Sequence, residues 1–237
     1  MRTKNLHSLQ GGALAAILLA GTLTLRADNN DIPAPPDGCG IKWSTLMPVT
    51  RPVRLANGRT VQEQEWWDPY NSGVRYFKWK VDLERAVQVG NVRTNMIFVY
   101  VLPQQPPAGI SAAIRRDWAN YQSWCHGLSF GNQIYNPGGY YVPFILAAGY
   151  TQVRCDMLQQ GDIMVYYSTG RNPVLGSPGS VVHTMISNGN GTFTSKDRFL
   201  PVVANQTKAA VDQQYGAGNT VVECFRCRPS ENKEERK

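Results

Sequence analysis

Charge, metal-ligand clusters and internal repetition are all scarce in this sequence of 237 residues. Charged residues make up 17% of the chain, and no basic stretch is interleaved with aromatic residues, which argues against a nucleic-acid-binding surface. The pair Cys224 and Cys227 forms a C-x-x-C without a second such pair, which argues against a structural zinc site. We therefore expect no metal, no other cofactor and no nucleic-acid partner.

The sequence has one long hydrophobic run, "GGALAAILLAGTLTL" (11–25), which follows Arg2 and Lys4 and ends just before Arg26 and Ala27. This order is typical of a signal peptide that is cleaved near Ala27. At about 15 residues, the run is short for a bilayer span. An uncleaved anchor or a buried helix remains the alternative. A lipid anchor is not expected, because "LAGT" (19–22) lacks the required cysteine.

Removal of residues 1–27 would lower the formal charge from +7 to +4, because three basic residues and no acidic one are lost. We expect an exported protein, periplasmic or secreted, that has no membrane contact after cleavage. The remaining positive charge suits an anionic cell-wall or surface polymer. The sequence does not indicate an oligomeric state.

Five cysteines follow the signal peptide, and an odd number in an oxidising compartment leaves one thiol unpaired. Cys224 and Cys227 lie three apart in "NTVVECFRC", an alternating strand pattern, so their side chains should point to opposite faces and not bond each other. We expect two disulfides that join Cys39 and Cys155 to Cys224 and Cys227, in an order left open. Cys125 is then the free thiol.

Proline, glycine and periodicity divide the chain. Asn57-Gly58 between alternating runs indicates a hairpin, "VRYFKWKVDLE" alternates, and "PQQPPAG" interrupts all regular structure. The expected segments are a signal peptide (1–27), an extended leader (28–40), a β-rich region (41–102), a linker (103–109), a catalytic domain (110–228) and a disordered tail (229–237).

The chain after the linker changes character. "ISAAIRRDWANYQSW" (110–124) has helical spacing, "CHGLSFGNQ" can begin another helix, and "YYVPFILAAGY" (140–150) indicates a short one. "IMVYY" (163–167) indicates a strand, and residues 181–196 form a hairpin pattern around "NGNG". Helices followed by an antiparallel sheet predict an α+β fold.

Cys125 and His126 are adjacent, and a thiol beside an imidazole raises the question of nucleophilic catalysis. If Cys125 begins a helix, its neighbour points about 100° away, so we do not expect His126 to be the base. The unpaired N–H groups of a helix start can lower a thiol pKa and hold an oxyanion. His183 is then the candidate base, with Ser195 or Asp197 from the return strand to orient it. An ordinary core or surface histidine is the alternative for His183.

Three motifs occur in the order "CHGLSF" (125–130), "QQGDIMVYY" (159–167) and "HTMISNGNGTF" (183–193). Over residues 115–225 this order resembles the NlpC/P60 group of papain-like cysteine peptidases and amidases. The resemblance implies a papain-like core in which N-terminal helices pack on an antiparallel sheet. It also implies Cys125 as nucleophile and His183 as base.

Some positions depart from that family. Trp124 stands where the family has Asp or Asn, and His126 where it has Ser. The third catalytic position falls on Ser195, with Asp197 as a substitute. We expect Tyr121, Trp124 and His126 to contact substrate.

The resulting hypothesis is an exported cysteine hydrolase that cleaves an amide bond in a peptide or a peptidoglycan stem peptide. The alternative is a non-catalytic exported protein that recognises a cell-wall or surface polymer through aromatic residues of the β-rich region. We prefer the simpler interpretation that those aromatics are the core and cover of a small β domain, or belong to strands that pack directly on the rest of the chain. The aromatics are Trp66, Trp67, Tyr70, Tyr76, Phe77 and Trp79.

Overall fold

The structure is a computed structural model, and it describes residues 37–68, 73–169, 180–216 and 220–228. The expected signal peptide, most of the leader, Tyr70 and the expected C-terminal tail lie outside these residues. Within the described ranges, no helix is long and apolar enough to cross a membrane.

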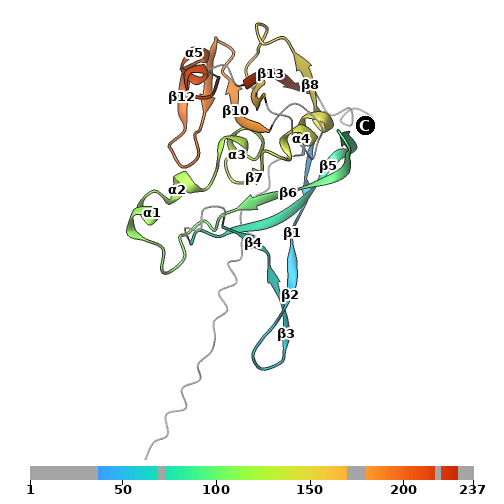
Figure 1. The fold of residues 1–237 in the computed structure, drawn as a ribbon, viewed down its shortest axis with the longest axis vertical. Coiled ribbons are helices and arrows are strands. Elements are labelled where there is room, and N and C mark those ends of the chain that lie inside the picture. Colours follow the sequence, from blue (N-terminus) through green and yellow to red (C-terminus); the bar gives the residue numbers. More distant parts are fainter. Residues whose placement is uncertain (1–36, 69–72, 170–179, 217–219, 229–237) are drawn as a thin grey trace, which may run out of the picture.

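The prediction of an α+β, papain-like core with N-terminal helices on a sheet is wrong. Strands account for 46% of the structure and helices for 18%, in three antiparallel sheets (Figure 1). The first three helices have only four to six residues: α1 (Ala112–Arg116), α2 (Trp118–Tyr121) and α3 (Cys125–Phe130).

The helical spacing of residues 110–124 is divided at Asp117. The backbone of Asp117 (φ −100°, ψ 17°) leaves the helical region, and Trp118 turns into the core. There the Trp118 indole N–H donates to the carbonyl oxygen of Pro103 at 3.0 Å. Burial of this large side chain outweighs the continuity of one longer helix.

The first sheet is formed by the β-rich region and one later strand. Its order is β1-β5-β6-β7, and β4 pairs with β5 at one side. A separate hairpin, β2–β3, turns at Asn57-Gly58 as predicted, with Gly58 at a φ of 80°. The bounds are β1 Ile41–Pro48, β2 Thr50–Arg54, β3 Thr60–Gln64, β4 Trp66–Trp67, β5 Tyr76–Val89, β6 Val92–Val101 and β7 Asn136–Pro137.

The second sheet has six strands in the order β12-β11-β10-β9-β13-β8. The predicted hairpin is confirmed as β10–β11, with Met185 opposite Ser195. The strands are β8 Tyr150–Val153, β9 Ile163–Ser168, β10 Val181–Ser187, β11 Thr192–Ser195, β12 Val203–Thr207 and β13 Thr220–Cys227. The remaining helices are α4 Val142–Gly149, α5 Lys208–Val211 and the π-helical turn η2 Asp212–Gly216.

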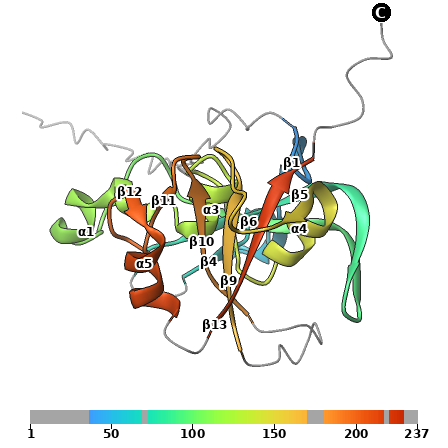
Figure 2. The ribbon, with the colours of Figure 1, turned by 90° about the horizontal axis from the view of Figure 1, so that it is seen from above.

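The two large sheets share one hydrophobic core. Val81 and Val99 of the first sheet belong to the same buried cluster as Val165 of the second sheet and Phe144 of α4. Figure 2 shows the first sheet and α4 together, as seen from above. Each fully buried side chain of this size contributes about 1.5–3 kcal/mol. The β-rich region therefore packs directly on the rest of the chain.

The other face of the second sheet carries a separate cluster. Met164, Met185 and Cys224 lie there beneath Val211 of α5. Strand alternation thus assigns successive β10 residues to two different environments, one facing α3 and the shared core, the other facing α5 and η2.

The disulfide prediction is confirmed. Cys39 bonds to Cys227 and Cys155 to Cys224, and Cys125 is the free cysteine. Cys224 is buried in the α5-side cluster, whereas Cys227 packs on the shared core, so the two residues of the C-x-x-C do lie on opposite faces.

A substitution at Gly149 tests how closely the turn at Cys39 and Gly40 packs against the end of α4. A Cβ at this position would lie 1.9 Å from the Gly40 nitrogen and 2.2 Å from the Cys39 carbonyl carbon. Backbone atoms cannot move away as a flexible side chain can, so Gly149→Ala should lower the free energy of unfolding by about 3 kcal/mol. Gly138→Ala is the matched control, because its nearest neighbour is at 3.9 Å. Urea unfolding measures both variants, and equal losses would contradict this packing account.

Candidate functional site

Cys125 begins α3, which lies in the chain between β6 and β7 of the first sheet. Trp124 before it is extended (φ −107°, ψ −176°), and no side chain caps the helix. The first N–H groups of α3 are therefore left without intrahelical partners beside the thiol. The Cys125 side chain is 9% exposed and unpaired.

A buried carboxamide fixes the backbone that presents Cys125. Asn136 Oδ1 accepts a hydrogen bond from the Trp124 N–H at 2.8 Å. Asn136 Nδ2 donates to the carbonyl oxygens of Gln122 at 2.7 Å and Tyr100 at 3.2 Å. The side chain thus joins β6 to the turn between α2 and α3. Sequence reasoning missed Asn136, whose signal was its place before the Pro137-Gly138-Gly139 turn.

His126 lies against the thiol, contrary to the expectation that the two side chains diverge. Its Nδ1 is 3.6 Å from Cys125 Sγ. The physical reason is a second contact, in which the same Nδ1 lies 3.1 Å from Thr184 Oγ1 on β10. Thr184 Oγ1 in turn accepts from Ser129 Oγ at 2.9 Å. This chain holds the imidazole over the sheet instead of letting it turn outward.

Burial makes His126 a neutral imidazole. Desolvation lowers its pKa from 6.5 to about 4. No carboxylate contributes to this shift, so the ring gains no partner that would stabilise its charged form.

His183 lies on β10 opposite Tyr166, on the face covered by α5 and η2. Its ring stacks on Tyr215 of η2 with centroids 4.0 Å apart and an interplanar angle of 8°. Its Nε2 is buried and has no hydrogen-bond partner among the described residues. An orphaned buried nitrogen of this kind is costly and therefore calls for a functional or solvent partner.

Tyr215 stacks on His183 and interacts electrostatically with Cys125. Burial is the largest cause that raises the pKa of Tyr215, followed by its hydrogen bond to Asp197, the charge of Asp197 and the charge of Cys125. The influence of Cys125 places the thiol within electrostatic reach of the ring that stacks on His183. Within the described residues, no hydrogen bond joins Cys125 directly to His183.

The two candidates for orienting the base have other partners. Ser195 Oγ donates a short hydrogen bond to Gln206 Oε1. Asp197 accepts from Gln214 Nε2 at 2.9 Å and binds the Tyr215 hydroxyl. In the part of the chain that the structure describes, neither residue contacts a ring nitrogen of His183. Asp197 instead acts on His183 through Tyr215.

The residues expected to contact substrate are largely engaged in packing. The rings of Tyr121 and Phe199 stack with their centroids 4.2 Å apart. Trp124 packs between Tyr76 and Trp67. Trp66 and Trp67 of β4 remain 37% and 44% exposed. Because Trp67 contacts Trp124, this aromatic surface is continuous with the residue before Cys125.

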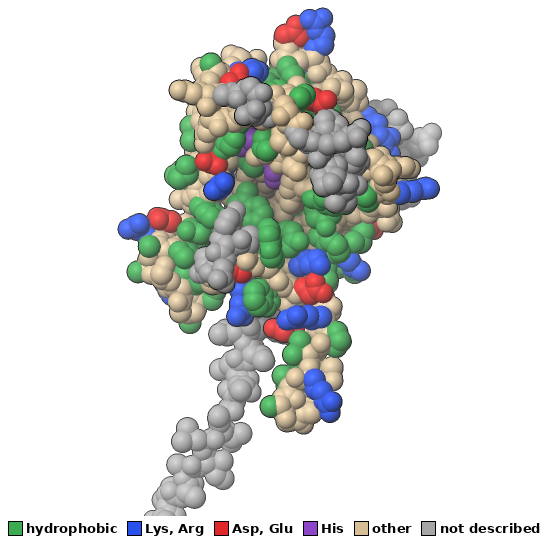
Figure 3. Space-filling model, in the orientation of Figure 1, with side chains coloured by type: hydrophobic (Ala, Val, Ile, Leu, Met, Phe, Trp, Pro, Cys, Tyr) green, Lys and Arg blue, Asp and Glu red, His purple; other side chains and the backbone are tan. Residues whose placement is uncertain are grey.

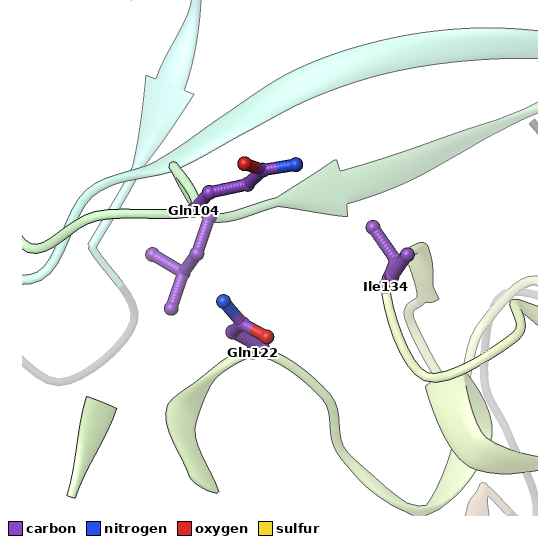
Figure 4. A pocket seen from close by; sticks show the side chains of 4 residues that line it. Gln104, Gln122 and Ile134 are labelled. Atoms are coloured by element: carbon purple, nitrogen blue, oxygen red, sulfur yellow. The ribbon is translucent and has the colours of Figure 1, made fainter. Parts of the chain in front are cut away.

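Two openings lie near these residues. Figure 3 shows histidine atoms within a hollow on one face of the molecule. A second opening, about 300 Å³ in volume, is lined by Leu102, Gln104, Gln122 and Ile134. Figure 4 shows Gln104, Gln122 and Ile134 around this space. Across the described ranges, no three histidine, cysteine or acidic side chains are grouped to hold a metal.

Comparison with family models, with curated proteins and with solved structures finds no match to this chain. The site consists of the unpaired thiol of Cys125, the neutral imidazole of His126 in contact with it, and His183, which stacks on Tyr215.

The pKa of His126 predicts a pH dependence of stability. In the unfolded chain the imidazole binds a proton below about 6.5, whereas in the folded protein it does so only below about 4. The free energy of unfolding should therefore fall by about 3 kcal/mol between pH 6.5 and pH 4 because of this group alone. His126→Asn should remove that component. Denaturant unfolding across this range checks it, and parallel curves for the two proteins would contradict it.

Asn136→Asp tests the carboxamide that positions Cys125. The aspartate keeps the acceptor for the Trp124 N–H but places an oxygen against the carbonyl oxygens that Nδ2 now serves. We expect a loss of about 3 kcal/mol in unfolding free energy and faster alkylation of Cys125. Asn95→Asp, at an exposed position, is the control. Unchanged stability in Asn136→Asp would show that the three contacts do not hold this turn.

Proposed function

We propose that the protein is an exported thiol hydrolase that cleaves an amide bond in a peptide or a peptidoglycan stem peptide, with Cys125 as nucleophile. The observation that carries the proposal is the position of the thiol. Cys125 is the unpaired one of five cysteines, and it begins a helix. Its Sγ lies 3.6 Å from His126 Nδ1. It also interacts electrostatically with Tyr215, whose ring stacks on His183.

The chemistry follows from those groups. A histidine accepts the thiol proton as Sγ forms a bond to the carbonyl carbon, and the N–H groups of the first turn of α3 hold the oxyanion. The C–N bond then breaks, the leaving amine takes the proton from the histidine, and a thioester remains on Cys125. Water hydrolyses the thioester, which releases the carboxylic acid and restores the thiol.

His183 is the proposed proton acceptor, although His126 makes the closer contact and lies with Cys125 on the α3 side of β10, whereas His183 faces η2. The Nδ1 of His126 is already held by Thr184, and the low pKa of His126 makes its protonated form unfavourable. The Nε2 of His183 has no hydrogen-bond partner within the described chain. Catalytic hydrogen bonds are often long in the free enzyme and tighten when substrate binds.

Export is supported by two disulfides, which are typical of an oxidising compartment, and by the signal-peptide pattern before Asp28. We propose a periplasmic or secreted location. A cell-wall substrate is consistent with the positive charge that remains after residue 27.

A non-catalytic binding protein is the second candidate. It is favoured by the exposed Trp66 and Trp67, with the Arg75 guanidinium 4.2 Å from the Trp66 ring centroid. Stacking of sugar rings on such tryptophans would retain polymer without any cleavage. In that case Cys125→Ala would leave both binding and the state of the polymer unchanged.

Incubation of the secreted form with purified peptidoglycan, followed by mass analysis of released fragments, separates the two candidates. The hydrolase should release fragments with new amine and carboxylate ends, and Cys125→Ala should release none. Retention of the wild-type fold in Cys125→Ala is checked by its unfolding curve. Binding to the polymer without fragments from the wild-type protein would support the second candidate and reject the first.

Two matched variants test the base. His183→Asn should lower kcat/KM by about 10²- to 10⁴-fold, the usual contribution of a general base, while His126→Asn should cost about tenfold or less. Both are buried histidines on the two sides of β10, so each controls for the loss of an imidazole from this region. An equal or larger loss in His126→Asn would transfer the role of base to His126.

A further inference from the structure

Lys196 is buried without a counter-ion. Its side chain is 2% exposed, at the end of β11. It makes no hydrogen bond and no ion pair in the described part of the chain, where the other basic side chains that form pairs lie nearer the surface. Its neighbour Asp197 is bound instead to Gln214 and Tyr215.

Among the residues outside the described ranges, the internal segments 69–72, 170–179 and 217–219 contain no aspartate and no glutamate, and the acidic residues all lie in the terminal segments 1–36 and 229–237. Burial lowers the pKa of Lys196, with no opposing contribution from an acidic group. Burial of a lysine side chain without a partner of opposite charge is costly in a protein interior.

The strand register indicates which face Lys196 occupies. Met185 is opposite Ser195, and Ile186 is opposite Thr194. Continuation of this antiparallel register by one residue places Lys196 opposite Thr184. Directly opposed residues share a face of the sheet, and Thr184 is the residue that contacts His126. Lys196 therefore belongs to the α3 side of β10 and β11, the side of Cys125 and His126.

The chain that follows Lys196 is held in place by two contacts. Asp197 is bound to η2 through Gln214, and Phe199 stacks on Tyr121 of α2. A lysine whose neighbouring chain is fixed in this way, on the α3 side of the sheet, is suited to bind a group of opposite charge that enters from outside.

We propose that Lys196 receives a carboxylate of the substrate, next to the amide that Cys125 attacks. The substrate class is then a peptide with a free carboxylate close to the scissile bond, at a chain end or on an acidic side chain. This inference rests on the proposed function for the identity of the site. The binding of an anion by Lys196 can be measured without turnover.

Two alkylating reagents of nearly equal size test the charge at the thiol. Iodoacetate is an anion and iodoacetamide is neutral, and both alkylate the same sulfur. We expect Lys196→Met to lower the ratio of the iodoacetate rate to the iodoacetamide rate at Cys125 by about tenfold, because one nearby charge is removed. Lys196→Arg should keep the ratio within about threefold. Lys208→Met, at an exposed lysine paired with Asp212, is the control and should not change the ratio.

A second measurement does not need a reactive thiol. N-acetylalanine should raise the melting temperature of the wild-type protein more than N-acetylalanine amide does, and Lys196→Met should abolish this difference. Lys196→Met should fold, because it replaces an uncompensated buried charge by an apolar chain of similar shape.

The outcomes separate this inference from the proposed function. A Lys196-dependent preference for the anion in the melting experiment, with an inert Cys125, would keep the anion site and reject the hydrolase. A reactive Cys125 whose reagent ratio and ligand preference are the same in Lys196→Met would keep the hydrolase and overturn the role of Lys196.

Discussion

The carboxamide of Asn136 joins the first sheet to the turn that presents the thiol. It binds the Tyr100 carbonyl oxygen of the first sheet and both ends of the turn that leads into α3. Because α3 has only six residues, it cannot hold its own position by helical hydrogen bonds. The direction of Cys125 therefore depends on a buried polar side chain whose donors and acceptor are all in use, the arrangement in which such groups fix a unique structure.

Electrostatics around the thiol follow from burial more than from paired charges. His126 is neutral because it is desolvated, and the Tyr215 hydroxyl is kept protonated by burial and by Asp197. Lys196 is the one buried lysine of the described chain, and the strand register places it on the same side of the sheet as His126. The proposed anion site would be costly while it is empty, as in proteins whose stability has been exchanged for function.

Local sequence signals predicted the elements whose cause is local. The Asn57-Gly58 and "NGNG" hairpins, the start of a helix at Cys125, the short helix that ends at Gly149 and the set of disulfide cysteines are all present in the structure. Parity of five cysteines and alternation around Cys224 sufficed for the pairing set. The order of pairing required the packing of β13 between β8 and β9.

Predictions that required tertiary packing were less successful. The spacing of residues 110–124 predicted a continuous helix, but burial of Trp118 divided it, and the fold is mostly β. The contact between Cys125 and His126 depends on Thr184, 58 residues later, so helical geometry alone could not show it. Tyr215, Asn136 and Lys196 entered the site through contacts between distant segments, which no single stretch of sequence encodes.

The most direct test of the central claim is to look for the covalent intermediate on Cys125. The protein is mixed with peptidoglycan fragments, quenched in acid within the first turnover and digested for mass spectrometry. The account predicts an acyl adduct joined through a thioester to the peptide that contains Cys125, formed and lost at rates that match product release. Release of cleaved fragments by a protein whose Cys125 has been fully alkylated beforehand would contradict it.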